Sequence, residues 1–450
     1  KKNMLSEASK ILEQLFKEKN KRSYNAFKRA QSILPGGSTR EISFHKPYPI
    51  YIKKGNGCWI QDIDNHTILD FLNNYMSLIL GHAHPKIVEA VKSQINNGTS
   101  FSAPTENEEQ LGTTISKRMP SIKSIRFTNS GSEATSLSIL AAKAFTGNKK
   151  IAKFEGAYHG TNENTMVSTN PKLVDAGTNE EPNPVPDGPH IQTNILENTI
   201  ILPFNNQRAC EKLLHHNREE LAAIIVEPVL GSAGIIPPKQ GFMQFLREIT
   251  EKNDILLIFD EVVTGFRISR GGAQEKYNVK PDITALGKNI GAGFPLGAFG
   301  GREDIMVQFD PRRENRIPHS GSLNANPVSL KAGLALLEEL TEDNYKKMSD
   351  LTTDVVRGLE KVFSEQNIDT KITQSGSLFG VHFTSEEVID YRSTMREDRI
   401  RKSNFFLGLL LNGAMIAPKG LGCISTPISN REVNIFLQKV AETMIYIKER

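Results

Sequence analysis

The sequence predicts an α/β protein with a large domain built on a mostly parallel sheet, followed by a smaller α+β domain. Short apolar runs alternate with segments of helical periodicity along most of the 450 residues. Two runs, LAAIIVEPV and DILLIFDEVV, are apolar almost throughout, as expected of strands that are covered on both faces. Between them, GFMQFLREITEKN has the periodicity and length of a crossover helix. These three segments predict a parallel βαβ unit.

The N-terminal third predicts two amphipathic helices around a strand. The first 30 residues predict a helix with a polar face and an apolar stripe of Leu5, Ile11, Leu12, Leu15 and Phe16. Further along, SIRFTNS predicts a strand, and EATSLSILAAKAFTG predicts a helix that ends at Gly147. The apolar positions of that helix are Ala134, Leu137, Ala141, Ala144 and Phe145.

The rest of the chain predicts a long loop and a second domain. Residues 167–193 are rich in Pro, Asn and Gly, which is typical of a surface loop. After a helical bridge, TKITQSGSLFGVHF and GAMIAPKGLGCISTPI predict strands of the smaller domain. We therefore divide the chain into an N-terminal segment that packs with the small domain (1–60), a large domain (61–325) and a C-terminal small domain (326–450).

Composition excludes several classes of function. The net charge of +4 is too small for a nucleic-acid-binding surface on a chain of this size. Cys58, Cys210 and Cys423 are far apart, so they predict neither a disulfide framework nor a thiolate metal site, and a reducing, cytoplasmic setting fits them. No apolar run is long enough to span a membrane, and the N-terminus is too charged for a signal peptide. We expect a cytoplasmic protein that binds no metal, nucleic acid or membrane.

Polar groups follow three of the predicted strands. Ser130, Gly131 and Ser132 begin a helix, where free N–H groups suit a phosphate; Asp260 ends a strand; and Lys288 follows another. Each has an ordinary alternative: a helix N-cap for the serines, a structural salt bridge for Asp260, and a solvated surface turn for Lys288. An aldehyde cofactor with a phosphate and a pyridine nitrogen would use all three groups, because an amine can form an imine with its carbonyl.

Six motifs extend this hypothesis: FTNSGSEA, KFEGAYHG, EPVLGSAGIIPP, FDEVVTGFR, LGKNIGAGFPLGAFGG and HSGSLNANP. In type and order they resemble the motifs of class III pyridoxal-phosphate-dependent aminotransferases. From LPGGSTREISFHKPYP to the C-terminus the chain resembles the subgroup that contains glutamate-1-semialdehyde 2,1-aminomutase and the β-phenylalanine-type β-amino acid aminotransferases. The resemblance implies fold type I, pyridoxal 5′-phosphate as cofactor, and a homodimer with its active sites at the subunit interface.

The resemblance also implies roles for residues around the cofactor ring. Lys288 would bind the cofactor covalently through its amine and then carry the proton that moves during transfer. Asp260 would pair with the ring nitrogen. Val262, expected two residues further along the same strand, would pack on one ring face and Tyr158 on the other. His159, from the same AYHG motif as Tyr158, is also assigned to the cofactor site.

Phosphate binding is assigned to a second group of residues. Ser130, Gly131 and Ser132 would bind the phosphate, together with Ser322 of the partner subunit. Glu227 would lie near the phenolic oxygen of the cofactor, with support of the fold as the alternative.

Three residues are assigned to the substrate. Arg40 matches the position of an arginine that binds a carboxylate in the β-amino acid enzymes, and a planar guanidinium suits that task. Tyr75 falls where relatives place an aromatic side chain in the substrate pocket. Lys419 stands where those enzymes may carry an arginine, and this departure puts that contact in doubt.

From these features we predict amino-group transfer between an amino acid and a 2-oxo acid, with a β-amino acid as the preferred donor. The alternative is glutamate-1-semialdehyde 2,1-aminomutase, and a decarboxylase or racemase on the same cofactor is a further class. Residues 168–194 lack the Gly/Ser-rich gating pattern of the aminomutases, and GLGCISTPI lacks an acidic residue that they place nearby. Both absences favour the aminotransferase.

Overall fold

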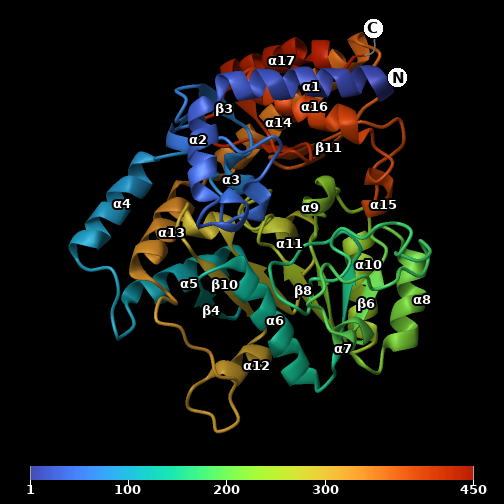
Figure 1. Ribbon diagram of the computed structural model, residues 1–450. Coiled ribbons are helices and arrows are strands. Elements are labelled where there is room, and N and C mark those ends of the chain that lie inside the picture. Colours follow the sequence, from blue (N-terminus) through green and yellow to red (C-terminus); the bar gives the residue numbers. More distant parts are fainter. Residues whose placement is uncertain (1, 449–450) are drawn as a thin grey trace. The chain divides into compact units, whose positions relative to one another are not determined.

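The computed structural model describes residues 2–448, which form two compact units (Figure 1). The two units are built from the following stretches: unit 1 from Lys1–His84, Lys347–Glu387 and Arg396–Arg450, and unit 2 from Pro85–Lys346 and Val388–Met395. Unit 1 therefore draws on both ends of the chain. The division at residues 60 and 325 rests on sequence pattern alone and stays a prediction.

Unit 2 is built on a seven-stranded sheet in the order β4-β10-β9-β8-β7-β5-β6. All strands run parallel except β10, which is antiparallel to both of its neighbours. The strands are β4 (Ser124–Thr128), β5 (Lys150–Phe154), β6 (Thr199–Leu202), β7 (Leu221–Val226), β8 (Leu256–Asp260), β9 (Ile283–Leu286) and β10 (Gly297–Gly301). The sequence patterns identified β4, β7 and β8 but not β10, because GAFGG has too little apolar bulk to mark a strand.

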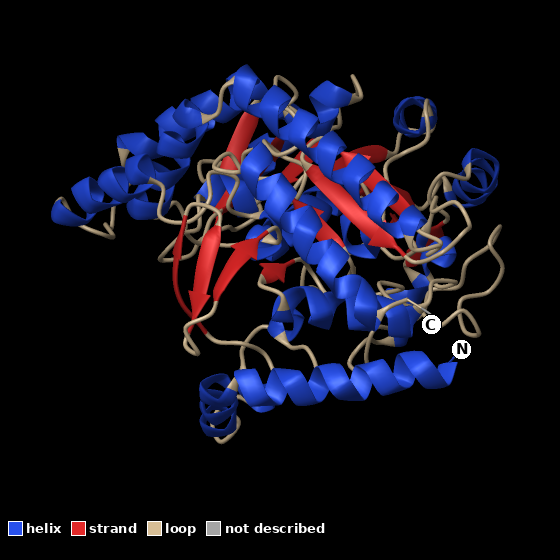
Figure 2. Ribbon diagram, turned by 90° about the horizontal axis from the view of Figure 1, so that it is seen from above, coloured by secondary structure: helices blue, strands red, loops and turns tan. Residues whose placement is uncertain are grey.

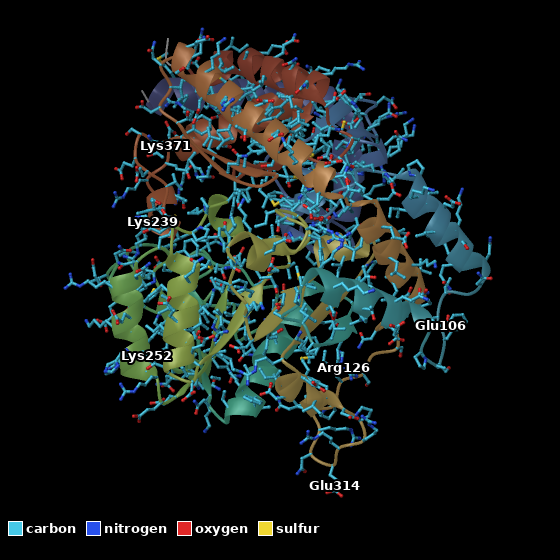
Figure 3. All side chains as sticks on the ribbon, turned by 180° about the vertical axis from the view of Figure 1, so that it is seen from behind. Glu106, Arg126, Lys239, Lys252, Glu314 and Lys371 are labelled. Carbon is cyan, nitrogen blue, oxygen red and sulfur yellow. The ribbon has the colours of Figure 1, made fainter. Side chains whose placement is uncertain are left out.

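Helices cover both faces of this sheet (Figure 2). Side chains of β7 alternate between the two faces: Ile225 joins a core with α6 (Gly131–Thr146), and Ile224 joins a core with α10 (Phe242–Lys252). Burial on both sides is the reason why this run is continuously apolar. Charged side chains such as Lys252 and Glu314 are exposed at the periphery of the unit (Figure 3).

Two helices of the sequence analysis need correction in detail. Within α6, Ala144 and Phe145 are exposed, because the last turn of the helix extends beyond the sheet. The N-terminal segment forms two helices, α1 (Lys2–Lys19) and α2 (Lys21–Ala30), divided at the buried Asn20. In α1, Leu5, Leu12 and Phe16 are buried as predicted, whereas Ile11 is 50% exposed.

Unit 1 contains two smaller sheets with helices around them. In one, β1 (Ile52–Asn56), β2 (Trp59–Asp62) and β3 (Thr67–Asp70) pair antiparallel, and β13 (Ala414–Met415) joins β3 in parallel. In the other, β12 (Leu378–His382) lies between β11 (Lys371–Ser375) and β14 (Leu421–Cys423). Leu12 and Phe16 of α1 pack in one core with Phe406 and Leu407 of α16 (Arg399–Leu411).

Two further features complete the fold. The predicted loop at 167–193 has neither helix nor strand before α7 (Thr193–Glu197), and its Gly177 and Pro182 form one of its isolated bridges. None of the helices in residues 2–448 is both long and apolar enough to cross a bilayer.

Candidate active site

Four neighbouring parallel strands of unit 2, β5, β7, β8 and β9, end at the same edge of the sheet. The residues that follow them are Glu155, Glu227, Asp260 (the last residue of β8) and Gly287, which precedes Lys288. Since ligands of open α/β sheets bind at the carboxyl ends of the strands, this edge is the candidate active site.

A buried carboxylate and a buried imidazole form the centre of the site. Asp260 Oδ2 lies 2.7 Å from Nδ1 of His159, and both side chains are almost fully buried. The backbone N–H of Val262 donates to Asp260 Oδ1 at 3.0 Å. The carboxylate accepts, so Nδ1 carries the proton, and the buried Nε2 of His159 has no partner among the described residues. Asp260 is thus oriented by two donors from different segments.

The beginning of α6 lies close to the residues that follow β8 and β9. A Cβ atom on Gly131 would come within 2.9 Å of the Val262 side chain, and one on Gly287 would come within 3.2 Å of the Gly131 Cα. The sequence analysis placed Val262 on the same strand as Asp260, but β8 ends at Asp260 and Val262 lies in the turn that follows it. Because Gly131 and Gly287 have no Cβ atom, these two segments can approach each other and Val262 so closely.

The two serines at this helix start make different bonds. Ser130 is the N-cap of α6, where its Oγ accepts the backbone N–H of Glu133 at 3.2 Å. The helix N-cap, which the sequence analysis gave as the alternative to phosphate binding, is therefore present. Ser132 Oγ accepts the backbone N–H of Thr161 at 3.0 Å. The segment after His159 is thereby attached to the first turn of α6.

Glu227 supports the loop that carries Tyr158. Its carboxylate accepts the backbone N–H of Tyr158 at 2.8 Å and that of Gly231 at 3.0 Å. Burial raises the pKa of Glu227 above its ordinary value, and the nearby charge of His159 opposes this shift. Tyr158 itself is 49% exposed.

Lys288 has a strained backbone. Its φ is +44°, in the left-handed region, at the start of the short 3₁₀ turn Lys288–Gly291. Such a conformation costs a residue with a side chain of order 1–3 kcal/mol and is most often retained at functional sites. The next residue, Asn289, is fully buried, and neither polar atom of its amide has a partner in residues 2–448.

Lys153, on β5, is a buried cation that the sequence analysis missed. Its ammonium donates to the carbonyl oxygens of Ala157 at 2.9 Å, Thr165 at 3.1 Å and Val167 at 2.5 Å. Burial lowers its pKa to about 8. It therefore fixes the segment on both sides of Tyr158 and His159. Within KIAKF it has no feature that distinguishes it from a solvated lysine.

The predicted substrate residues lie in unit 1. Arg40 Nη1 donates to Asn74 Oδ1 at 2.7 Å, and the guanidinium carbon lies 5.9 Å from the ring centre of Tyr75. The structure therefore brings Arg40 and Tyr75 together, with Asn74 as a partner that sequence reasoning missed. Lys419 is exposed in the turn between β13 and β14.

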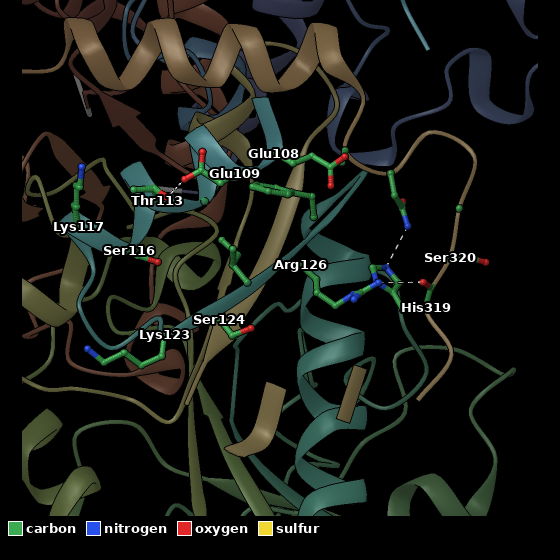
Figure 4. Close-up of a pocket in the computed structure, with 16 residues that line it drawn as sticks. Glu108, Glu109, Thr113, Ser116, Lys117, Lys123, Ser124, Arg126, His319 and Ser320 are labelled. Atoms are coloured by element: carbon green, nitrogen blue, oxygen red, sulfur yellow. Dashed lines mark hydrogen bonds between the residues drawn. The ribbon is translucent and has the colours of Figure 1, made fainter. Parts of the chain in front are cut away.

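Ser322 is exposed in a loop of unit 2 that borders a pocket of about 800 Å³ (Figure 4). This loop is held by Asn324, which accepts from the amide of Asn129 at 2.8 Å, and by His319, which accepts from Nε of Arg126 at 2.9 Å. The pocket is lined by residues of α5 (Glu106–Arg118) and β4 and, from the loop, by His319, Ser320, Gly321, Asn324 and Ala325, but not by Ser322. None of the buried strand-end groups lines it.

The chain is similar to known proteins over almost its whole length. The family model described as aminotransferase class-III matches residues 43–426. A glutamate-1-semialdehyde 2,1-aminomutase from Methanothermobacter thermautotrophicus is 39% identical over 95% of this chain and 100% of its own length. An ω-transaminase structure from Sphaerobacter thermophilus has a TM-score of 0.91 and 40% identity, covering 94% of this chain and 97% of its own. A β-phenylalanine aminotransferase from Variovorax paradoxus has a TM-score of 0.88 and 30% identity, covering 97% and 96%.

Proposed function

We propose a substrate for this chain, which belongs to the class-III aminotransferase family. It is a pyridoxal-phosphate-dependent enzyme, and its α/β fold is the one predicted from the sequence. The proposed reaction is the conversion of glutamate-1-semialdehyde to 5-aminolevulinate. The observation that carries it is 39% identity to an aminomutase over 95% of this chain and the whole of that relative. This reverses the order predicted from the sequence, in which the β-amino acid aminotransferase came first.

The residues at the sheet edge fit the cofactor. The close approach of Gly131, Gly287 and Val262 forms a cradle that a Cβ atom on either glycine would fill. The first N–H groups of α6 would bind the phosphate, with Ser132 beside them. Asp260, oriented by His159, would hold a proton on the ring nitrogen. When bound, pyridoxal phosphate supplies a ring that withdraws electrons from the carbon bearing the amino group.

Side chains of the protein would then move one proton of the substrate. Lys288 would remove it from the substrate carbon and return it at a neighbouring position, as a general base and then a general acid. Glu227 and Lys153 would hold the segment that carries Tyr158 and His159 in place while this happens. In an aminomutase both halves of the reaction act on one carbon skeleton, so the amino group leaves one carbon and returns to its neighbour.

A β-amino acid aminotransferase is the second candidate. It is favoured by the contact of Arg40 with Tyr75, which suits a donor carboxylate, and by the identities of 40% and 30% to the ω-transaminase and the β-phenylalanine aminotransferase. The homodimer, with Ser322 of the partner subunit at the phosphate, is likewise a proposal that rests on the family resemblance.

One assay separates the two candidates. Enzyme loaded with the cofactor is incubated with glutamate-1-semialdehyde and no other amino donor, and 5-aminolevulinate is measured. In parallel, β-phenylalanine is offered with 2-oxoglutarate or pyruvate. We expect efficient formation of 5-aminolevulinate. Amino transfer from β-phenylalanine without any 5-aminolevulinate would contradict the aminomutase and favour the second candidate.

A further inference from the structure

The turn after β3 has an unusual backbone. Four successive residues, none of them glycine, have positive φ: Asn73 (56°), Asn74 (48°), Tyr75 (53°) and Met76 (70°). The left-handed helical region costs an L-residue roughly 1–2 kcal/mol, and Asn is among the few that visit it routinely. A run of four is therefore costly, and such strain persists only where the surroundings impose it and the resulting geometry has a use.

A buried carboxylate, Asp70, holds the turn and is hydrogen-bonded to His82. Asp70 Oδ1 accepts the backbone N–H groups of Leu72 at 3.0 Å and Asn73 at 2.7 Å, and its Oδ2 lies 2.7 Å from Nε2 of His82. The hydroxyl of Ser77 donates to the carbonyl of Asn74 at 2.8 Å. The turn is thus held from both ends.

The turn presents two side chains to Arg40. Asn74 Oδ1 accepts from its Nη1 at 2.7 Å, and the Tyr75 ring lies 5.9 Å from the guanidinium carbon. Tyr75 is itself fixed, since its hydroxyl donates to the carbonyl of Ile42 at 2.6 Å. Arg40 has no carboxylate partner in the described part of the chain.

The side chain at position 74 is an amide, and this affects how available the positive charge of Arg40 is to a ligand. An amide oxygen orients the guanidinium but does not neutralise it, so the positive charge stays available to an anion. A carboxylate in the same place would orient Arg40 equally well and would also compete with any anion that the guanidinium could bind.

We propose that Asn74 is a positioning residue that holds the Arg40 guanidinium over Tyr75 ready for the substrate carboxylate, and so sets the preference of the enzyme for acids over amines without a carboxylate. This inference rests on the proposed function insofar as the substrate is an amino acid. It goes beyond that function by naming Asn74 as the residue that orients Arg40, and it gives a reason for the strained turn.

Two variants of Asn74 separate orientation from charge. Asn74→Gly keeps the left-handed backbone, which glycine adopts without cost, and removes the amide. Asn74→Asp keeps the acceptor and adds a negative charge beside Arg40. Asn278 provides the matched control, because it is also an exposed Asn with a positive φ of 51° but lies in unit 2, so Asn278→Gly and Asn278→Asp test the substitutions alone.

Kinetics are measured with two pairs of compounds that differ by the carboxylate: 5-aminolevulinate against 1-aminobutan-2-one, and β-phenylalanine against 1-phenylethylamine. For Asn74→Asp we expect KM of the acids to rise about tenfold, the effect of losing one charge-assisted hydrogen bond, with kcat and the KM of the amines unchanged. For Asn74→Gly we expect a smaller rise of the same kind. Both Asn278 variants should match the wild type.

Calorimetric titration with levulinate, an acid without an amino group, measures carboxylate affinity without turnover. We expect Kd for levulinate to rise about tenfold in Asn74→Asp. Equal Kd values for the wild type and both Asn74 variants would overturn the inference, as would equal losses for acids and amines. A wild type that binds levulinate better than Asn74→Asp but transfers no amino group would overturn the proposed function and leave the inference standing.

Discussion

Two clusters of functional groups differ in how they are held in place. In unit 2, Asp260 and His159 are almost fully buried, and backbone groups at the ends of strands orient them. In unit 1, Arg40 and Asn74 are exposed, and a single hydrogen bond between side chains joins them above a strained turn. The groups that we propose for catalysis are thus buried, while the guanidinium that we propose selects among substrates is exposed to water.

The difference has an energetic reason. In a buried site of low dielectric, a carboxylate and its partners interact strongly and keep one arrangement. An exposed guanidinium interacts more weakly with its neighbours but can exchange its hydration shell for a substrate carboxylate. We therefore expect substitutions in the buried cluster to affect catalysis itself and those in the exposed cluster to affect only selectivity.

The largest effect is expected for Lys288→Ala. The variant lacks the amine that we propose binds the cofactor and carries the proton, so kcat should fall by about 10³-fold or more. The cofactor should still bind, though without a covalent bond, and dialysis should remove it more readily. Lys280→Ala, an exposed lysine of the same unit, is the control. Activity within tenfold of the wild type would remove Lys288 from the site.

Asp260→Asn tests the buried carboxylate that is hydrogen-bonded to His159. The substitution keeps the shape of the side chain but removes the charge that we propose pairs with the ring nitrogen of the cofactor, so kcat should fall by about 10²–10³-fold. The visible absorbance of the bound cofactor should also change. Asp254→Asn, at an exposed position just before the same strand, controls for the loss of one carboxylate. A near-normal rate with tight cofactor binding would make Asp260 a purely structural residue.

The smallest effect on catalysis is expected for Lys153→Met, which acts through stability. Burial lowers the pKa of Lys153 from 10.5 to about 8, so between these values the unfolded chain binds more protons than the folded one. The free energy of unfolding of the wild type should therefore rise relative to that of the variant as the pH increases from about 8 to 10.5. Below pH 8, the difference reflects three carbonyl groups without a donor, offset by relief from a buried charge.

Thermal unfolding at a series of pH values measures this difference. Lys150→Met provides the control, because Lys150 lies on the same strand, is partly exposed and pairs with Glu220 at 2.6 Å. A difference between the wild type and Lys153→Met that does not change across the window would mean that Lys153 is not held as a buried cation.

The sequence predicted the structure correctly where a local pattern of residues matches the burial of those residues in the folded chain. The run around β8 predicted both a buried strand and a carboxylate at its end, and Asp260 is the last residue of that strand. The bond between His159 and Asp260 joins residues 101 positions apart, which no local pattern encodes. The turn at Asn73–Met76 contains no glycine, so its positive φ values were not predictable either. The turn is hydrogen-bonded to Asp70, which in turn contacts His82, and only the folded chain provides this contact between residues 12 positions apart.

The packing of α1 has a consequence for how the protein is made. Ser9 of this helix donates to the amide oxygen of Asn404 in α16, 395 residues later. At about 5–20 residues per second, a ribosome needs roughly 20–80 s to synthesise the residues between Ser9 and Asn404. During this time Leu12 and Phe16 can pack only against the early part of their core, such as Phe27 and Tyr48, because Phe406 and Leu407 do not yet exist. The α16 side of the N-terminal helix therefore stays uncovered until synthesis nears its end, and a chaperone that shields apolar segments would find a target there.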